Sequence, residues 1–538
     1  MRIHISKNSL AFSLLLLAVA AGSGVYVAHC MAYAPWGYSD SAAFFSAARN
    51  LASGHGISVS MPGGSYTPLN LHAPFLPMLL SPFARLNLDL IDVMRVLDVS
   101  FWGLFVFLSG WLFYAITGRS IASLGFALGC AFSYPLAALF TSLMSEPLAL
   151  VLGVPGFLFL ILGISRDSLR WIIVGAVLGG LAVLTRFAFE ALSLAGLLAI
   201  LMLKGGSWKK RGVWAIIYGI LSGFPLLLWT LYQRLQHVTT GGRSIVLDGD
   251  TVSKAVQFFR QVYGTMKYWF PYRTNMIPGV RADYFTPILS LAFLVMIVAA
   301  IVISIRRYRA AKKLEPTVVL MMSMIFYAVC YSAVLLPSFA LSSVAIDINE
   351  RMLAPLIPAA IGILLAAAVI IGSGSSRVVL RNAAAVVVTL FFVVFNYTPM
   401  REYLISSSNY PGGFASPAWK GQPIFDRIDQ LPSNTVLVSN APDVVLFYTN
   451  RYPYCLSEGE DVTGCYSVQD LENFTTQIEG QCGAAVLFPG NKADQYENYP
   501  DPVTGETIDG LESQHNVFYS GDDGYIIFLN QCDISQGG

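Results

Sequence analysis

The sequence predicts a polytopic α-helical membrane protein that ends in a folded α/β domain. Of its 538 residues, 55% are hydrophobic and only 12% are charged, whereas soluble domains carry about 25% charged residues. Apolar runs of about 20 residues, the length that crosses a bilayer, recur up to Asn396, and none follows it. The net charge of +1 indicates neither a nucleic-acid partner nor an acidic tail.

We expect about eleven transmembrane helices in a module that covers residues 1–396. The spans are predicted at 9–29, 95–117, 121–140, 146–164, 171–187, 189–203, 213–233, 285–305, 317–337, 352–372 and 378–396. The first could also be a signal peptide, because residues 20–24 form a weak cleavage-like site. Its apolar stretch is too long for a signal h-region, so an uncleaved anchor is the prediction.

Basic residues in the short connections predict the orientation of these spans, because such residues concentrate in cytoplasmic loops. They lie at 119, 166–170, 204–211, 306–313 and 377–381, in every second connection. The N-terminus is therefore predicted inside, and three long segments, 30–94, 234–284 and 397–538, outside. This pattern predicts a multi-pass protein of the plasma (inner) membrane whose working face is extracytoplasmic.

The segment 397–538 has the pattern of a soluble α/β domain. Helices are expected around 425–431 and 443–449, and strands around 434–439, 484–488 and 525–529. Four of the seven cysteines fall here, and an even set in an exported domain indicates disulfides. Sequence proximity favours pairing Cys455 with Cys465 and Cys482 with Cys532. A zinc site is the competing interpretation, although no Cys-x-x-Cys spacing is present.

The first outer segment contains the most informative polar residue, Asp40. Two apolar stretches, at 42–52 and 74–80, are too short to span and are flanked by Gly or Pro, so we expect interfacial helices along the membrane surface. Asp40 precedes the first of them. One interpretation is a helix N-cap, where Asp is favoured. The functional interpretation is a carboxylate that takes a proton from an incoming hydroxyl.

Further charged residues are predicted at the outer boundary of the spans: Glu146, Arg186, Glu190, Glu350 and Arg351. A charge at membrane depth costs about 2.5–3.5 kcal/mol, so such residues usually face a polar cavity. Two arginines at this level suit an anionic group, and ordinary interfacial snorkelling is the alternative. In the second outer segment, Lys267 and Arg273 lie among aromatic residues, which suits either a phosphate and a sugar ring or interfacial anchoring.

These motifs resemble the GT-C superfamily of membrane glycosyltransferases, over nearly the whole chain. The resemblance is closest to the branch with the protein O-mannosyltransferase-like enzymes, the aminoarabinose transferases of lipid A and the lipopolysaccharide-core transferases. It is carried by Asp40, Leu51-Ala52-Ser53-Gly54, Tyr66, the prolines from Pro68 to Pro77, Ser145-Glu146, Leu184-Thr185-Arg186, Arg351, Pro355 and Pro358. One departure is Ser41, where many relatives have a second acidic residue, so a single candidate base remains.

The resemblance implies transfer of a sugar from a polyprenyl-phosphate carrier to an acceptor hydroxyl at the outer face, with inversion. The acceptor would be a glycan, a lipid or a protein, and membrane lipids would surround the site. Asp40 would deprotonate the acceptor, while Arg351 and Arg186 stabilise the departing phosphate. Glu146 is the next candidate for the base. Substrate or interface contacts are expected from Tyr66, His72, Lys267 and Arg273.

Two histidines of the first outer segment, His55 and His72, could help to bind a divalent metal ion; their other interpretation is as polar loop residues. Two other classes of protein remain open. A flippase or transporter of a lipid-linked sugar would share the spans and the arginines, but it should show an internal repeat and charges near the bilayer midplane. A non-catalytic assembly protein would not need carboxylates and arginines at one depth.

Overall fold

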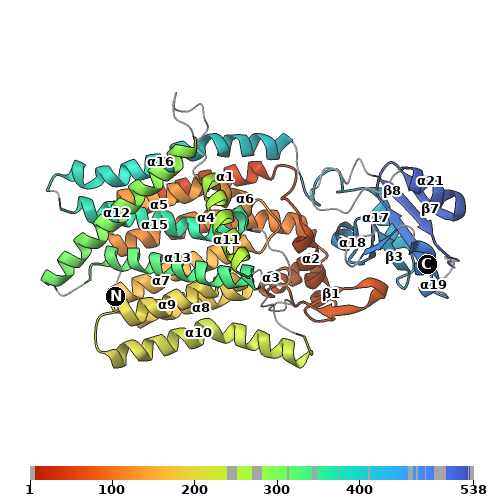
Figure 1. Cartoon of the computed structure of the whole chain (residues 1–538), viewed down its shortest axis with the longest axis horizontal. Coiled ribbons are helices and arrows are strands. Elements are labelled where there is room, and N and C mark those ends of the chain that lie inside the picture. The colour runs from red at the N-terminus through yellow and green to blue at the C-terminus, as the bar shows by residue number, and fades with distance from the viewer. Residues whose placement is uncertain are drawn as a thin grey trace.

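The structure is a computed structural model that describes residues 7–238, 251–269, 282–311, 314–341, 348–374, 376–409, 412–457, 465–467, 470–478, 480–489, 505–530 and 532. Figure 1 shows an elongated molecule in which long helices form a bundle and a C-terminal region with a sheet lies at one end of it. Helix α2 (Ser39–Ala52) lies between the two parts.

In the described chain, eight helical runs are long and apolar enough to cross a membrane. They are α1 (Lys7–Cys30), α4 (Leu90–Thr117), α7 (Glu146–Arg166), α10 (Trp208–Leu235), α12 (Ala282–Ala311), α13 (Pro316–Ala340), α14 (Glu350–Leu353) continued by η3 (Ala354–Leu356) and α15 (Ile357–Gly372), and α16 (Val378–Asn409). The pair α5 (Ser120–Ala131) and α6 (Tyr134–Phe140), which is bent by 60°, passes the same test when it is taken together, and counted as one span it brings the number in the described chain to nine. The predicted spans fall on these helices, with two exceptions. The exceptions are the spans predicted at 171–187 and 189–203, which lie between α7 and α10.

The two remaining spans correspond to shorter helices, α8 (Leu169–Thr185) and η2 (Phe187–Phe189) with α9 (Glu190–Leu203). At 17 residues, α8 is about 26 Å long, slightly less than a hydrocarbon core of about 30 Å. It packs closely on α7, because a Cβ atom at Gly175 would lie only 2.6 Å from the carbonyl oxygen of Gly156. The predicted helical membrane fold is confirmed.

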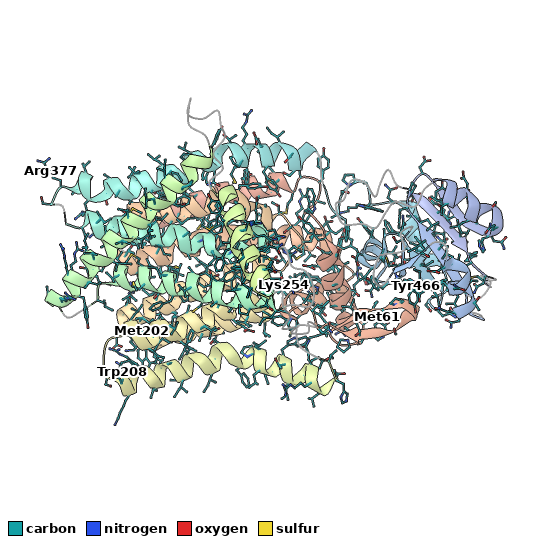
Figure 2. All side chains as sticks on the ribbon, in the orientation of Figure 1. Met61, Met202, Trp208, Lys254, Arg377 and Tyr466 are labelled. Atoms are coloured by element: carbon teal, nitrogen blue, oxygen red, sulfur yellow. A yellow bond between two sulfur atoms is a disulfide. The ribbon has the colours of Figure 1, made fainter. Side chains whose placement is uncertain are left out.

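The basic connections gather at the end of the bundle away from the sheet. Asp167, between α7 and α8, accepts hydrogen bonds from Lys204 at 2.5 Å and Lys210 at 2.7 Å, which precede and open α10. Arg307 near the end of α12 donates to Ser373 after α15 at 2.6 Å. In Figure 2, Trp208 and Arg377 lie at this same end. The positive charges therefore share one end of the molecule, and its assignment to the cytoplasm stays a prediction.

The first outer segment folds into α2, a hairpin of β1 (Ser58–Ser60) and β2 (Tyr66–Pro68) with η1 (Pro62–Gly64) between them, and α3 (Phe75–Arg85). Helices α2 and α3 pack on each other. The two expected short helices are thus present, and their position on a membrane surface stays a prediction. The second outer segment contributes α11 (Thr251–Trp269), which packs on α13 and α14.

The C-terminal region contains a six-stranded sheet in the order β5-β4-β3-β6-β8-β7. Its elements are α17 (Pro423–Gln430), β3 (Val436–Ser439), α18 (Pro442–Thr449), β4 (Tyr454–Ser457), β5 (Cys465–Ser467), α19 (Leu471–Gln477), β6 (Gly483–Leu487), α21 (Gly505–Gln514), β7 (Asn516–Gly521) and β8 (Gly524–Phe528). Strands β3 to β6 are parallel, and β8 joins β6 antiparallel. The predicted α/β character is confirmed, whereas the domain boundary predicted at residue 396 lies within α16 and stays a prediction.

A disulfide ties the end of the sheet together, as predicted. Cys482 and Cys532 are bonded, with Cα atoms 4.7 Å apart. Cys455 is also disulfide-bonded, and its Cα is the register partner of that of Cys465 across β4 and β5; the side chain of Cys465 lies outside the described part of the chain.

The C-terminal region is docked on α2 through α18. The rings of Phe45 and Phe447 stack with centroids 4.9 Å apart. Arg49 donates to the carbonyl oxygen of Phe447 at 2.6 Å, and Asn450 donates to the side chain of Asn50 at 2.8 Å. This contact packs α18, which follows strand β3 of the sheet, against α2, whose first turn contains Asp40. Figure 1 shows α18 next to α2.

Candidate active site

Four charged residues predicted from the sequence meet at the end of the bundle that faces the sheet. Asp40 comes from the first turn of α2, Glu146 opens α7, Arg186 follows α8, and Arg351 lies in α14. They form a chain of ion pairs in the order Asp40–Arg351–Glu146–Arg186. Two negative and two positive charges therefore alternate, and the set is neutral as a whole.

Glu146 is the buried centre of this chain. Its side chain is fully buried, and its Oε1 forms ion pairs with Arg186 Nη1, 2.6 Å away, and with Arg351 Nε, which also donates a hydrogen bond to it. The hydroxyl of Ser145 donates to the other carboxylate oxygen at 3.3 Å. A buried carboxylate is tolerated only when it is paired and hydrogen-bonded, which both arginines provide. The geometry therefore makes Glu146 the group that holds the two guanidinium groups.

Asp40 differs from Glu146 because its side chain is 29% exposed. One oxygen, Oδ2, pairs with Arg351 Nη2, and the other, Oδ1, lies 3.8 Å from His72 Nε2. Burial by itself raises the pKa of Asp40, but the charge of Arg351 and its hydrogen bond bring that pKa below the ordinary 3.8. Burial lowers the pKa of His72 below 6.5, against the effect of Asp40. At pH 7 Asp40 is thus ionised and His72 neutral.

A junction between three chain segments holds Asp40 in place. Ser41 accepts a hydrogen bond from the backbone of Tyr38 at 2.9 Å and donates to the carbonyl of Leu143 at 2.6 Å. Trp36 forms a parallel bridge with Ser142, just before Glu146. The segment that enters α2 is therefore bonded to the segment that enters α7, and this places the two carboxylates together. Asp40 is not the N-cap of α2, a position that Tyr38 occupies.

Arg351 is held by the turn that begins α14. Asn349 caps the helix by accepting from the backbone N–H of Met352 at 3.2 Å, and Tyr331 donates to the carbonyl of the same residue at 2.7 Å. Helix α11 supports this turn, because Gln261 accepts from the backbone of Ile348 at 3.0 Å. The described part of the second outer segment thus contributes a support for Arg351.

The other residues predicted to bind substrate or metal are placed differently. Tyr66 stacks on His55 with ring centroids 4.2 Å apart. Within the described residues, no hydrogen bond or ion pair joins either ring to the four charged residues. Arg273 lies outside the described residues, and so does the side chain of Lys267. No group of three or more His, Cys, Asp or Glu side chains in the described chain is arranged to hold a metal ion, so the predicted His55–His72 option has no ligand set there.

The structure adds a third carboxylate that sequence reasoning missed. Asp443 lies in the first turn of α18, the helix that packs on α2. Burial raises the pKa of Asp443, and the same burial raises the pKa of Tyr452 to about 12. The charge of Asp40 adds to the rise in the pKa of Asp443, and the hydroxyls of Ser39 and Tyr452 partly offset it. The only signal in the sequence was the pattern Ser439-Asn440-Ala441-Pro442-Asp443, which gave no indication that α18 returns to α2.

No protein-family profile and no curated protein matches this sequence. Solved structures do share its fold. ArnT from Cupriavidus metallidurans in the apo state superposes with a TM-score of 0.54 at 13% identity, over 97% of this chain and 99% of that one. The archaeal oligosaccharyltransferase AglB from Archaeoglobus fulgidus, in complex with an inhibitory peptide and a dolichol-phosphate, gives 0.52 at 12% identity, over 89% and 70%. An oligosaccharyltransferase from Archaeoglobus fulgidus in the apo form gives 0.53 at 12%, over 97% and 75%.

The chain therefore has the fold of the GT-C membrane glycosyltransferases, as the sequence predicted. At these identities the likeness concerns the fold, and the activity has to be argued from the residues of this chain.

Proposed function

We propose that this chain is a glycosyltransferase that moves a sugar from a polyprenyl-phosphate carrier to an acceptor hydroxyl, with inversion at the anomeric carbon. The observation that carries the proposal is the ion-pair chain Asp40–Arg351–Glu146–Arg186. It puts a partly exposed, ionised carboxylate beside two guanidinium groups whose own counter-ion, Glu146, is buried.

In this reaction the acceptor oxygen attacks the anomeric carbon, and the bond between that carbon and the phosphate oxygen breaks. The hydroxyl proton passes to Asp40, and the electron pair of the broken bond leaves with the polyprenyl phosphate. A guanidinium has five N–H donors, and the side chain of Arg351 is 32% exposed although it pairs with both carboxylates. Arg351 therefore retains donors for the phosphate, and Arg186 supports the same charge.

The ligand class is supported by the AglB structure, which holds a dolichol-phosphate. In the orientation proposed here, residues 1–396 form the catalytic module, and both the active site and region 397–538 face the extracytoplasmic side of the plasma membrane. A lipid-linked donor in the outer leaflet would then present its phosphate at the depth of the two arginines.

The decisive experiment measures sugar transfer from a polyprenyl-phosphate sugar by purified protein, together with binding of that donor. Asp40→Asn keeps the size of the side chain but removes the base, so donor binding should remain while transfer falls by about 100- to 10,000-fold. Glu146→Gln should behave differently. Breaking a buried ion pair costs about 3–5 kcal/mol, so it should lower thermal stability and donor binding together.

Asp509→Asn, on the exposed surface of α21, is the matched control and should leave both measurements unchanged. Near-normal transfer by Asp40→Asn would refute the assignment of the base. If the wild type bound the donor and only moved it across the bilayer of a vesicle, the chain would be a flippase instead.

A further inference from the structure

Helix α11 is attached to the ends of two spans, at the end of the bundle that faces the sheet. The ring of Phe258 packs on that of Phe339, in the last turn of α13, with centroids 5.7 Å apart. Gln261 accepts from the backbone N–H of Ile348, just before the span that α14 begins, and Thr265 donates to the carbonyl oxygen of the same residue; both distances are 3.0 Å. These spans have 25 and 23 residues, so at about 1.5 Å per residue each exceeds a hydrocarbon core of about 30 Å. Helix α11 therefore lies at the depth where the spans leave that core.

One face of α11 exposes large apolar side chains. The residues of this face are between 37% and 75% exposed, and they form what is called the α11 stripe: Val252, Val256, Phe259, Tyr263 and Met266. They follow one another at intervals of four and three residues, which places them on the same side of a helix. The neighbouring face exposes polar side chains instead, those of Ser253, Gln257 and Arg260. An apolar and a polar surface thus run side by side along the helix.

The depth and direction of α11 indicate what covers the stripe. Adjoining exposed apolar side chains mark an interaction surface. Figure 1 shows α11 running across the long helices of the bundle and not along them, the direction of a helix that lies in a membrane surface. Such helices bury the apolar face at the boundary between head groups and acyl chains and turn the polar face to the head groups. Arg260 beside the stripe suits this arrangement, since a guanidinium reaches head-group oxygens while its stem stays apolar.

We propose that α11 is an interfacial helix whose stripe inserts among the acyl chains of the leaflet on the side of the sheet, and that this insertion holds the turn that carries Arg351. Another face of the same helix makes both hydrogen bonds to Ile348, three residues before Arg351. The lipid surface thus positions Arg351 through α11 without touching it. The insertion itself goes beyond the proposed function, and only its effect on donor binding rests on that function.

The insertion is tested with the full-length protein in phosphatidylcholine vesicles whose acyl chains carry bromine, which quenches a fluorophore on contact. A fluorophore attached to Val256→Cys should be quenched several-fold more than one attached to Gln257→Cys. Gln257 is the matched control, because it is the next residue and lies on the exposed polar face. The free cysteines among the described residues are buried, so the label reports the introduced position.

The link to Arg351 is tested by amide hydrogen exchange in the same vesicles. Val256→Ser combined with Phe259→Ser removes apolar surface from the stripe. The Ile348 amide, which donates to Gln261, should then exchange faster by roughly 5- to 150-fold, the usual range of coupling between two sites. Leucine at the same two positions keeps the stripe apolar and should restore wild-type exchange, and Gln257→Ser should leave it unchanged. Binding of polyprenyl phosphate should weaken in the double serine variant alone.

Equal quenching at the two labelled positions, or none at Val256→Cys, would overturn the insertion. Loss of quenching on addition of polyprenyl phosphate would assign the stripe to the chain of the donor, and cross-links between two copies through Val256→Cys would assign it to a second copy; either result overturns the proposal. Unchanged exchange at Ile348 in the double serine variant would overturn the link to Arg351. Failure of the wild type to bind or turn over a polyprenyl-phosphate donor would instead refute the proposed function, and quenching and exchange are measured without a donor.

Discussion

Asp40 and Glu146 have the same functional group, but their surroundings give them different chemistry. Both were predicted from the sequence as catalytic candidates, because each lies at the outer end of a helix. The structure places Glu146 entirely inside the protein between two arginines, whereas Asp40 is 29% exposed. A general base has to reach the proton that it removes. Exposure therefore favours Asp40 as the base and Glu146 as the counter-ion.

The pH dependence of transfer should report the influence of Arg351 on Asp40. Burial raises the pKa of Asp40, yet Arg351 brings it below 3.8, so the wild-type profile of kcat/KM should have no acid limb from this group above about pH 4. Arg351→Gln removes the charge and keeps the burial. The pKa then rises, and the acid limb should move to higher pH in the profile of the residual activity.

Protonation of Asp40 at low pH should lower the stability of the folded state, just as it should lower the rate of transfer. A carboxyl whose pKa is lowered by folding contributes stability above its unfolded pKa and loses it as the pH falls through the folded value.

The measurement of transfer compares profiles of relative rate between pH 4 and 9, so the lower absolute activity of the Arg351→Gln variant does not matter. An identical acid limb in both proteins would show that Arg351 does not control the ionisation of Asp40.

The segment that leads into α2 is held by contacts with two other segments that are distant in the sequence. The segment at Trp36–Tyr38 is bonded on one side to the turn before α7 and on the other to the segment after α16, where the N–H of Phe414 donates to the carbonyl of Gly37 at 3.1 Å. Gly413 makes this approach possible. Its φ is +74°, and a Cβ there would lie 2.4 Å from the carbonyl oxygen of Gly37.

Gly413→Ala should therefore destabilise the protein more than the same change at another glycine of similar conformation. Gly421 is the matched control, with a φ of +79° and open space around it. Both alanines carry the left-handed backbone penalty of about 1–2 kcal/mol. Only Gly413→Ala adds the clash, which we expect to cost about 1–3 kcal/mol more. Thermal unfolding in detergent measures the difference, and equal losses in the two variants would show that the Gly37 contact does not matter.

Whole-molecule features were predictable where they depend on local composition. The spans, the short outer helices and the strands around 434–439, 484–488 and 525–529 follow from the length and periodicity of apolar runs. The docking of α18 on α2 was not predictable. Asn50 and Asn450 are 400 residues apart, and the sequence around each of them does not indicate which residue it contacts. The order of the ion pairs was not predictable for the same reason. The predicted topology places the four charged residues at the same depth in the membrane, but which of them pair depends on how four helices pack.

The orientation in the membrane is the whole-molecule prediction that remains to be measured. Ser207, at the start of α10, lies among the basic connections, whereas Ser408 lies near the end of α16 on the side of the sheet. Ser207 is exposed and Ser408 is half-buried. Single cysteines at these positions should label differently in intact cells: Ser207→Cys only after permeabilisation, Ser408→Cys without it. Background should be low, since the free cysteines among the described residues, Cys30, Cys130 and Cys330, are buried. The opposite pattern would invert the proposed topology and the face on which the site lies.

The contact between α18 and α2 also has a consequence for the order in which the protein is made. Phe45 is almost completely covered in the finished fold, partly by Phe447. A ribosome adds about 5–20 residues per second, so the 400 residues that separate Asn50 from its partner Asn450 take about 20–80 s to synthesise. Throughout that interval the cover of α2 does not yet exist. The face beside Asp40 is thus among the first surfaces to be synthesised and among the last to be closed.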